Sequence, residues 1–345
     1  MKILCIGEEW KGSNASGLFY ALSRIGFVTN VVNELSYIST QAKTFSAKGI
    51  NKISRSIQVN DFNAQLCSIT QSFQPDLILV YKGAYISRDT IQFWKQRNLP
   101  VVNFFPDVSF MAHGKYIPDC IRLYDHIFTT KSFGAQDLKK NFGISSEKIS
   151  FLPHGFDPTV HLPKQQDVSF QCDASFIGNY SLRKESYLKK LKEDMPEIDL
   201  RIWGSTWRRN DNDPLSTAIQ SFAVLGDSYA LAISNSKINV ALLSERVSGA
   251  SSGDQITSRT FHIPAAGGFM LHQRTEELKQ YFEEGEEIAC FESEAELVEK
   301  TAYYLSRESE RERIRVNGYQ RAIAEHSMDA RAQSFVQILR VKHII

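Results

Sequence analysis

Cysteine is scarce in this chain and is never closely paired. Five cysteines are spread over 345 residues, with no Cys-x-x-Cys pair and no histidine at metal-ligand spacing. This distribution argues against a disulfide scaffold and against a zinc site. We expect buried thiols of a reducing compartment.

Long apolar runs are also absent. No stretch of about 18 apolar residues occurs, and the apolar run at the N-terminus closes at Gly7, too early for a signal peptide. The sequence therefore predicts no integral membrane segment and a cytoplasmic location.

An excess of one charge is missing as well. Forty Lys and Arg stand against 39 Asp and Glu, a formal net charge of +1, so there is no general electrostatic footprint for nucleic acid or an anionic membrane. Residues 1–160 hold 17 basic and 12 acidic side chains. This mild excess is explained by an anionic acceptor or by ordinary solvated surface charge.

What the chain does have is the length and pattern of two α/β domains. Its 345 residues exceed the size of about 250–300 at which one core stops growing, and 42% hydrophobic residues are typical of a folded protein. Apolar runs such as 3–6 and 76–81 alternate with segments of helical periodicity such as 61–73 and 90–96. This alternation predicts parallel sheets covered by helices.

The alternation lapses over 153–171, a stretch with three prolines, and we place the linker there. A second series of βα units follows. The predicted fold class is thus α/β, with two Rossmann-like, doubly wound domains. Residues 1–160 form the first domain and 161–328 the second, and a C-terminal helix at 329–345 crosses back to the first.

The densest group of candidate binding residues lies at 254–271. A predicted helix that carries Arg259 and Thr260 in its first turn favours an anion such as phosphate. Gly267 and Gly268 permit close backbone approach. A helix C-cap that leads into a buried strand explains these two glycines equally well.

This segment resembles the nucleotide-sugar-binding signature of group 1 glycosyltransferases, specifically the branch that includes the CgeB spore-maturation proteins. Further matches follow in order along the chain: FFPD at 104–107, YDHIFT at 124–129, LPHGFD at 152–157, HLP at 161–163, FIG at 176–178, IWG at 202–204, SKINV at 236–240 and GEE at 285–287. The resemblance covers most of the chain. It implies the GT-B architecture, in which two Rossmann-like domains face a cleft and the second binds the donor.

The resemblance also implies individual donor-binding residues. Gly178 and Arg183 take the positions that bind the donor diphosphate, and an arginine fork suits phosphate; a solvated arginine at a helix start is the alternative. Trp203 and Gly204 lie beside the nucleotide, and Val224 belongs to the segment that brackets the base. Trp203 fits a hydrophobic core equally well.

In related enzymes two acidic residues eight positions apart frame this signature, the first near the donor sugar and the second on the ribose. Asp254 and His262 take these positions here. A neutral histidine accepts one hydrogen bond where a carboxylate accepts several, so this departure puts ribose recognition in question. A core histidine packed on Phe261 and Phe269 is the alternative.

Asp107, in the loop after a predicted strand, is the candidate catalytic residue. It is expected to act as a general base or to orient an acceptor hydroxyl, and a loop N-cap is its rival role. The DND sequence at 211–213 is predicted to be an exposed turn. We therefore expect no metal and no cofactor, with the leaving diphosphate stabilised by Arg183, Arg259 and helix N-termini.

Together these features predict a metal-independent glycosyltransferase of hexosyltransferase type. It would move a sugar from a nucleotide-diphosphate sugar to a glycan, lipid-linked or protein acceptor in surface or spore glycan assembly, and nucleic acid is not an expected partner. The resemblance to group 1 implies retention of configuration. A sugar-nucleotide epimerase would be expected to carry a carboxylate at position 262. A non-catalytic sugar-nucleotide or glycan binder is the alternative from another class.

Overall fold

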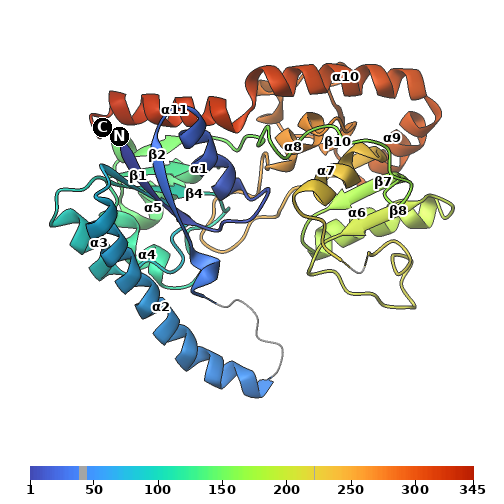
Figure 1. The fold of residues 1–345 in the computed structure, drawn as a ribbon. Coiled ribbons are helices and arrows are strands. Elements are labelled where there is room, and N and C mark those ends of the chain that lie inside the picture. Colours follow the sequence, from blue (N-terminus) through green and yellow to red (C-terminus); the bar gives the residue numbers. More distant parts are fainter. Residues whose placement is uncertain (39–44, 221) are drawn as a thin grey trace. The chain divides into compact units, whose positions relative to one another are not determined.

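The computed structural model describes residues 1–38, 45–220 and 222–345. The chain divides into two compact units: unit 1 is Met1–His154, Arg246–Ser252 and Asp329–Ile345, and unit 2 is Gly155–Glu245 and Gly253–Met328. These ranges differ from the expected domains at 155–160, which fall in unit 2, and at 246–252, which fall in unit 1. Each unit contains its own sheet (Figure 1).

In unit 1, strands alternate with helices along most of the chain. The elements are β1 (Lys2–Gly7), α1 (Asn14–Arg24), β2 (Val28–Asn33), η1 (Glu34–Ser36), α2 (Phe45–Phe73), β3 (Leu77–Tyr81), α3 (Arg88–Lys95), β4 (Val101–Phe105), α4 (Tyr116–Cys120), η2 (Ile121–Leu123), β5 (His126–Thr129), α5 (Gly134–Phe142), η3 (Ser146–Lys148), β6 (Ile149–Phe151) and α11 (Met328–Val341). The strands pair in parallel in the order β2-β1-β3-β4-β5-β6.

The central strands of unit 1 are apolar on both faces. Ile3, Leu4, Cys5 and Ile6 of β1 are each at most 1% exposed. Parallel strands covered by helices on both sides have this pattern, because no face of the sheet meets water.

Helix α11 returns to unit 1 after the whole of unit 2. Phe335 is completely buried, and its ring centroid lies 4.6 Å from that of Phe128 in β5. At the start of the helix, Asp329 pairs with Arg24 of α1 at 2.6 Å. The helix therefore forms part of the core of unit 1.

In unit 2 the same alternation is repeated. The elements are β7 (Cys172–Ile177), α6 (Leu182–Asp194), β8 (Leu200–Trp203), α7 (Asp227–Ser234), β9 (Ser236–Ala241), α8 (Arg259–Ala265), β10 (Met270–Gln273), η4 (Leu278–Gln280), β11 (Ala289–Phe291), α9 (Glu294–Ser306) and α10 (Glu308–Glu325). The parallel order is β11-β10-β9-β7-β8, and α6 packs on α9 while α8 packs on α10 (Figure 1).

Both sheets have one strand order when strands are counted from the start of each unit. The first five strands of unit 1 and the five of unit 2 follow the doubly wound order 2-1-3-4-5. The predicted class, two Rossmann-like α/β domains, is confirmed.

The segment after His154 pairs with the segment before α11. Phe156 N donates to the His326 carbonyl at 3.0 Å, and Met328 N donates to the Phe156 carbonyl at 2.7 Å. A Cβ on Gly155 would lie 2.8 Å from the His326 carbonyl oxygen, so this pairing requires glycine at 155.

The five cysteines are free thiols. Four are buried as expected, whereas Cys67 is partly exposed on α2. None of the helices in the described part of the chain combines the length and apolar character that a membrane span requires.

Candidate functional site

The topology of unit 2 indicates where a ligand would bind. Ligands of doubly wound sheets bind beyond the carboxyl ends of the strands, where the strand order reverses. In unit 2 this position lies between β7 and β9. The loops that follow these two strands, at 178–181 and 242–258, therefore form the candidate site.

Two cationic side chains converge on this edge of the sheet. The Lys184 Nζ lies 3.3 Å from the Ser244 Oγ and 3.4 Å from the Asn179 carbonyl oxygen. Arg259 Nη2 donates to the Leu242 carbonyl at 2.7 Å. Lys184 and Arg259 come from α6 and α8, so two helices deliver positive charge to one place.

Lys184 is buried and Arg259 is partly buried. Lys184 is only 5% exposed, and burial together with the charge of Arg259 lowers its pKa below the ordinary lysine value. Burial likewise lowers the pKa of Arg259, and its Nε has no hydrogen-bond partner among the described residues. Neither side chain forms an ion pair with a carboxylate of the described residues. The negative charges of Asp254 and Glu245 act on this pair without forming an ion pair. Because cations held away from water are costly, the arrangement favours an anionic ligand.

Acidic and small residues shape the rim of this site. Asp254 N donates to the Ser244 carbonyl at 2.9 Å, and the Asp254 carboxylate accepts from Ser244 N at 3.4 Å. A Cβ on Gly178 would lie 3.0 Å from Arg259 Nη1, so glycine at 178 leaves room for the guanidinium. Gly178, Asp254 and Arg259 thus lie together at this edge.

Arg183 does not join the two cations. Its side chain is exposed, and its guanidinium carbon lies 5.9 Å from the ring centroid of Tyr187, one turn further along α6. The structure instead brings Lys184, the next residue, next to Arg259. Lys184 is a functional candidate that the sequence analysis missed.

Trp203 and Val224 lie inside unit 2. They are 1% and 3% exposed, and form a small cluster with Cys172 and Ala232. Gly204 allows the backbone of Gly178 to approach closely, because a Cβ at position 204 would lie 2.1 Å from the Gly178 carbonyl oxygen. The Trp203 carbonyl also accepts from Gly178 N at 2.9 Å. Trp203 and Gly204 therefore adjoin the loop that carries Gly178 through their backbones, while the Trp203 side chain lies in the core.

Thr260 and His262 are both buried on α8. The Thr260 Oγ1 lies 2.9 Å from the His272 Nε2. His262 stacks on His161 with ring centroids 3.8 Å apart, and its Nε2 lies 3.2 Å from the Gly155 carbonyl oxygen. The ring of His262 also packs on that of Tyr229, with centroids 5.8 Å apart. His262 is thus a buried histidine inside unit 2.

Gly267 and Gly268 lie at the opposite edge of the sheet. They follow α8 and precede β10, hence at the amino ends of the parallel strands. Gly267 has a φ of +72°, and Gly268 N donates to the Ile263 carbonyl at 2.9 Å. This geometry is that of a helix C-cap.

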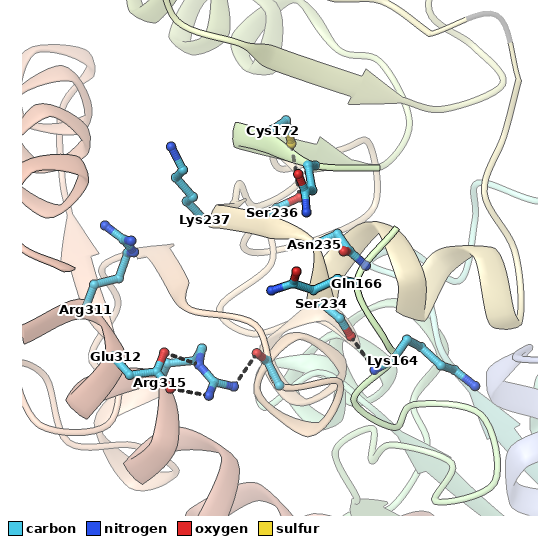
Figure 2. A pocket seen from close by; sticks show the side chains of 12 residues that line it. Lys164, Gln166, Cys172, Ser234, Asn235, Ser236, Lys237, Arg311, Glu312 and Arg315 are labelled. Atoms are coloured by element: carbon cyan, nitrogen blue, oxygen red, sulfur yellow. Dashed lines mark hydrogen bonds and ion pairs between the residues drawn. The ribbon is translucent and has the colours of Figure 1, made fainter. Parts of the chain in front are cut away.

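A pocket of about 570 Å³ opens at this amino edge, with Gly267, Cys172 and Ser236 in its wall (Figure 2). Three of its cations are neutralised by carboxylates: Lys164 by Asp227, Lys237 by Asp173 and Arg315 by Glu312. The charge here is largely balanced, in contrast to the pair formed by Lys184 and Arg259.

In unit 1 the order reverses between β1 and β3, and the residues after the strands again carry charge. Asp107, after β4, lies 2.9 Å from both the Lys82 Nζ and the His113 Nε2. Burial alone would raise the pKa of Asp107, but hydrogen bonds and charge from His113 and Lys82 outweigh it and hold the pKa well below its usual range. Asp107 is therefore a persistent anion.

A second carboxyl group in unit 1 behaves in the opposite way. Glu34, directly after β2, is 3% exposed. Burial and the charge of Glu8 raise its pKa to about 7, against the opposing charge of Lys82. Tyr81, at the end of β3, is also buried, and its hydroxyl has no hydrogen-bond partner among the described residues. Unit 1 thus offers a carboxyl group that titrates near neutral pH and an unused hydroxyl.

The predicted turn at 211–213 is a turn. Asp213 N donates to the Asn210 carbonyl at 2.8 Å, and the Asp213 carboxylate accepts from Leu215 N and pairs with Lys189. Within the described ranges, no cluster of three His, Cys, Asp or Glu side chains has the arrangement of a metal site.

Comparison with known families adds to this geometry. Residues 183–337 match the family model described as "Glycosyl transferase-like". The match includes Lys184, Asp254 and Arg259 and extends into α11. A search of curated proteins finds no significant match.

Solved structures resemble the chain over nearly its full length. The sucrose-phosphate synthase of Thermosynechococcus elongatus is 12% identical with a TM-score of 0.68, and the match covers 99% of this chain and 98% of that one. The fold is GT-B. The Anabaena protein HepE, solved with UDP and glucose, is 11% identical over 99% of both chains with a TM-score of 0.64. The UDP-GlcNAc 2-epimerase of Neisseria meningitidis, solved with UDP-GlcNAc, is 12% identical over 99% of this chain and 100% of that one, with a TM-score of 0.55. The GT-B fold thus includes both transferases and epimerases, and the choice between them depends on the site.

Proposed function

We propose that the protein is a glycosyltransferase that takes its sugar from a nucleotide-diphosphate donor bound in unit 2. The observation that carries this proposal is the pair formed by the buried Lys184 and the partly buried Arg259, at the point where the strand order of unit 2 reverses. A departing diphosphate carries the charge that such a pair would neutralise. The match of residues 183–337 to the glycosyl transferase-like model supports the same reaction class.

The two cations take the place that a metal ion fills in other diphosphate sites. Arg259 offers a planar fork and Lys184 a point charge, and both interactions strengthen where water is excluded. We therefore propose metal-independent transfer with no resident cofactor. UDP is the first nucleotide to test, because HepE, which shares the fold, is solved with UDP and glucose.

Unit 1 would supply the groups that meet the acceptor. Because Asp107 is held as an anion by Lys82 and His113, its role is to orient an acceptor hydroxyl rather than to take up a proton. Glu34 is better matched to proton transfer, because its pKa of about 7 lies near the working pH.

The sequence resemblance carries the finer assignment. The motifs at 104–107 and 254–271 favour the CgeB-like branch, and with it a cytoplasmic enzyme of surface or spore glycan assembly that acts on a glycan, lipid-linked or protein acceptor.

The test is a thermal titration of the full chain with UDP, ADP, GDP and their glucose conjugates. A ligand that binds only the folded protein raises the unfolding midpoint, and we expect one nucleoside diphosphate to do so. Lys184→Ala and Arg259→Ala should abolish the rise, whereas the matched control Arg183→Ala should keep it. The proposal fails when no nucleotide raises the midpoint, or when the rise survives both substitutions.

A non-catalytic sugar-nucleotide or glycan binder is a second candidate, and His262 is the observation that favours it. The position implied for ribose recognition holds a buried histidine already engaged by His161 and Gly155. The two functions are separated by incubating the protein with the nucleotide sugar that raised its unfolding midpoint and measuring the free sugar released. A transferase hydrolyses its donor slowly without an acceptor, whereas a binder leaves the donor intact.

A further inference from the structure

Unit 1 contains a second pocket that the proposed reaction does not use. It measures about 440 Å³ and lies between the start of α3 and the α4–η2 segment. We call it the α3–α4 pocket. Its wall includes Arg88, Lys115, Tyr116, Asp119, Cys120 and Arg122.

The three cations of the α3–α4 pocket, Arg88, Lys115 and Arg122, are exposed side chains. Arg122 donates its Nε to the Phe142 carbonyl at 2.6 Å, which leaves its two terminal amino groups for other partners. The Lys115 Nζ lies 5.4 Å from the ring centroid of Tyr116. Among the described residues, no carboxylate forms an ion pair with Arg88, Lys115 or Arg122. The pocket in Figure 2 differs in this respect, because three of its cations are paired.

One carboxylate, Asp119, also lines the α3–α4 pocket. Cys120 is 1% exposed, and the charges of Asp119, Arg88 and Asp89 all act on its buried thiol. The lining therefore holds three positive charges and one negative charge. This local excess accounts for part of the basic balance of residues 1–160, which the sequence alone did not assign to a site.

The excess of positive charge in the lining suits a dianion such as a phosphate group. Two arginine forks bind phosphate oxygens in bidentate fashion, and a lysine adds a point charge. A pocket of about 440 Å³ is large enough for a phosphate and the first groups attached to it.

We propose that the α3–α4 pocket binds a phosphate group carried by the acceptor. This inference rests on the proposed function, because that function assigns the acceptor to unit 1. It narrows the acceptor class to phosphorylated molecules. The phosphate belongs either to a soluble sugar phosphate or to a lipid headgroup.

The test uses inorganic phosphate as the probe and the full chain as the protein. Thermal unfolding is followed against phosphate concentration at constant ionic strength set with chloride. We expect a saturable rise in the midpoint. The double variant Arg88→Ala/Arg122→Ala should weaken the apparent phosphate affinity by about tenfold or more, since each hydrogen bond to a charged group contributes strongly.

Two matched variants make the result specific. Asp119→Asn removes the one negative charge of the lining and should tighten phosphate binding, whereas a merely destabilising change would not. Lys184→Ala alters the donor site of unit 2 and should leave the Arg88-dependent component intact. The two proposals can therefore fail separately. A missing UDP response would refute only the donor site, and a missing Arg88-dependent phosphate response would refute only the phosphate site in the pocket.

A second arm identifies the source of the phosphate. Glycerol phosphate is compared with vesicles of phosphatidylglycerol in phosphatidylcholine. Binding to either that depends on Arg88 and Arg122 supports the proposal and names the source as soluble or lipid-linked. The proposal would be overturned if the wild type and the double variant responded identically to phosphate, to glycerol phosphate and to the vesicles.

Discussion

At the scale of single residues, the donor site depends on which of two neighbours faces the sheet. Lys184, Tyr187, Leu188 and Leu191 are the buried residues of α6, a spacing of i, i+3, i+4 and i+7 that marks one helix face. Arg183 lies outside that face. The signal was present in the sequence, as a lysine in an apolar stripe, but the family resemblance directed attention to the arginine.

Replacing Lys184 should separate stability from binding. Lys184→Met removes a buried charge but keeps the length of the side chain, so the unliganded protein should gain on the order of 1 kcal/mol in unfolding free energy. The same variant should lose its response to UDP. Urea unfolding with and without nucleotide measures both. A variant that is less stable than the wild type without ligand would show that Lys184 is a structural cation.

The raised pKa of Glu34 predicts how the free energy of unfolding changes with pH. Its pKa is about 7 in the folded protein and 4.5 in its ordinary state. Between these values the unfolded chain releases the proton while the folded chain retains it, so the stabilising contribution is complete below pH 4.5 and is lost as the pH rises to 7.

Glu34→Gln cannot ionise and should escape this loss. Relative to the wild type, it should be more stable at pH 8 than at pH 4.5 by about 2–3 kcal/mol, from 1.4 kcal/mol per pKa unit. Urea unfolding of both proteins at the two pH values gives the difference directly, because all other groups are shared. An equal difference at both pH values would refute the raised pKa.

At the scale of elements, the strongest apolar runs were predictable, whereas two short elements, β11 and α4, were not. β1 after Lys2 and the whole of β3 are buried runs, and such runs predict central strands of a parallel sheet. β11 has only three residues, and α4 has five with a proline among them. Neither is long enough to show a period, so tertiary packing rather than local pattern determines them.

Helix α11 should contribute strongly to unit 1 through one aromatic contact. Phe335→Ala removes a completely buried ring that packs on Phe128, and we expect a loss of about 3–5 kcal/mol in unfolding free energy. Val341→Ala, at a position 68% exposed in the same helix, is the control and should change stability by less than about 0.5 kcal/mol. Chemical denaturation of the pair tests the contact, and equal small effects would contradict it.

At the scale of the whole molecule, topology predicts sites that residue types alone do not. Both units share one strand order, and in both the charged residues after the strands gather near the reversal. From the sequence, Asp107 was predicted to lie in the loop after a strand, but Glu34 and Lys82 were missed. Each of these two is a single charge after a strand, with no motif around it.

A chain that ends at Met328 lacks the part of α11 that belongs to unit 1. We expect unit 1 to lose its cooperative unfolding while unit 2 keeps it, because the residues that pack on Phe335 would be exposed to water. Calorimetry should then show one transition that still responds to UDP. Two undiminished transitions would mean that α11 is dispensable.

The discontinuity of unit 1 also sets an order of events during translation. Domains usually fold as the ribosome releases them, the N-terminal one first. Here the N-terminal unit lacks a wall of its core until residues 329–345 have been made, whereas unit 2 is complete once residue 328 has emerged. The second unit of the chain can therefore fold first. Until then the apolar surface around Phe128 is available to chaperones.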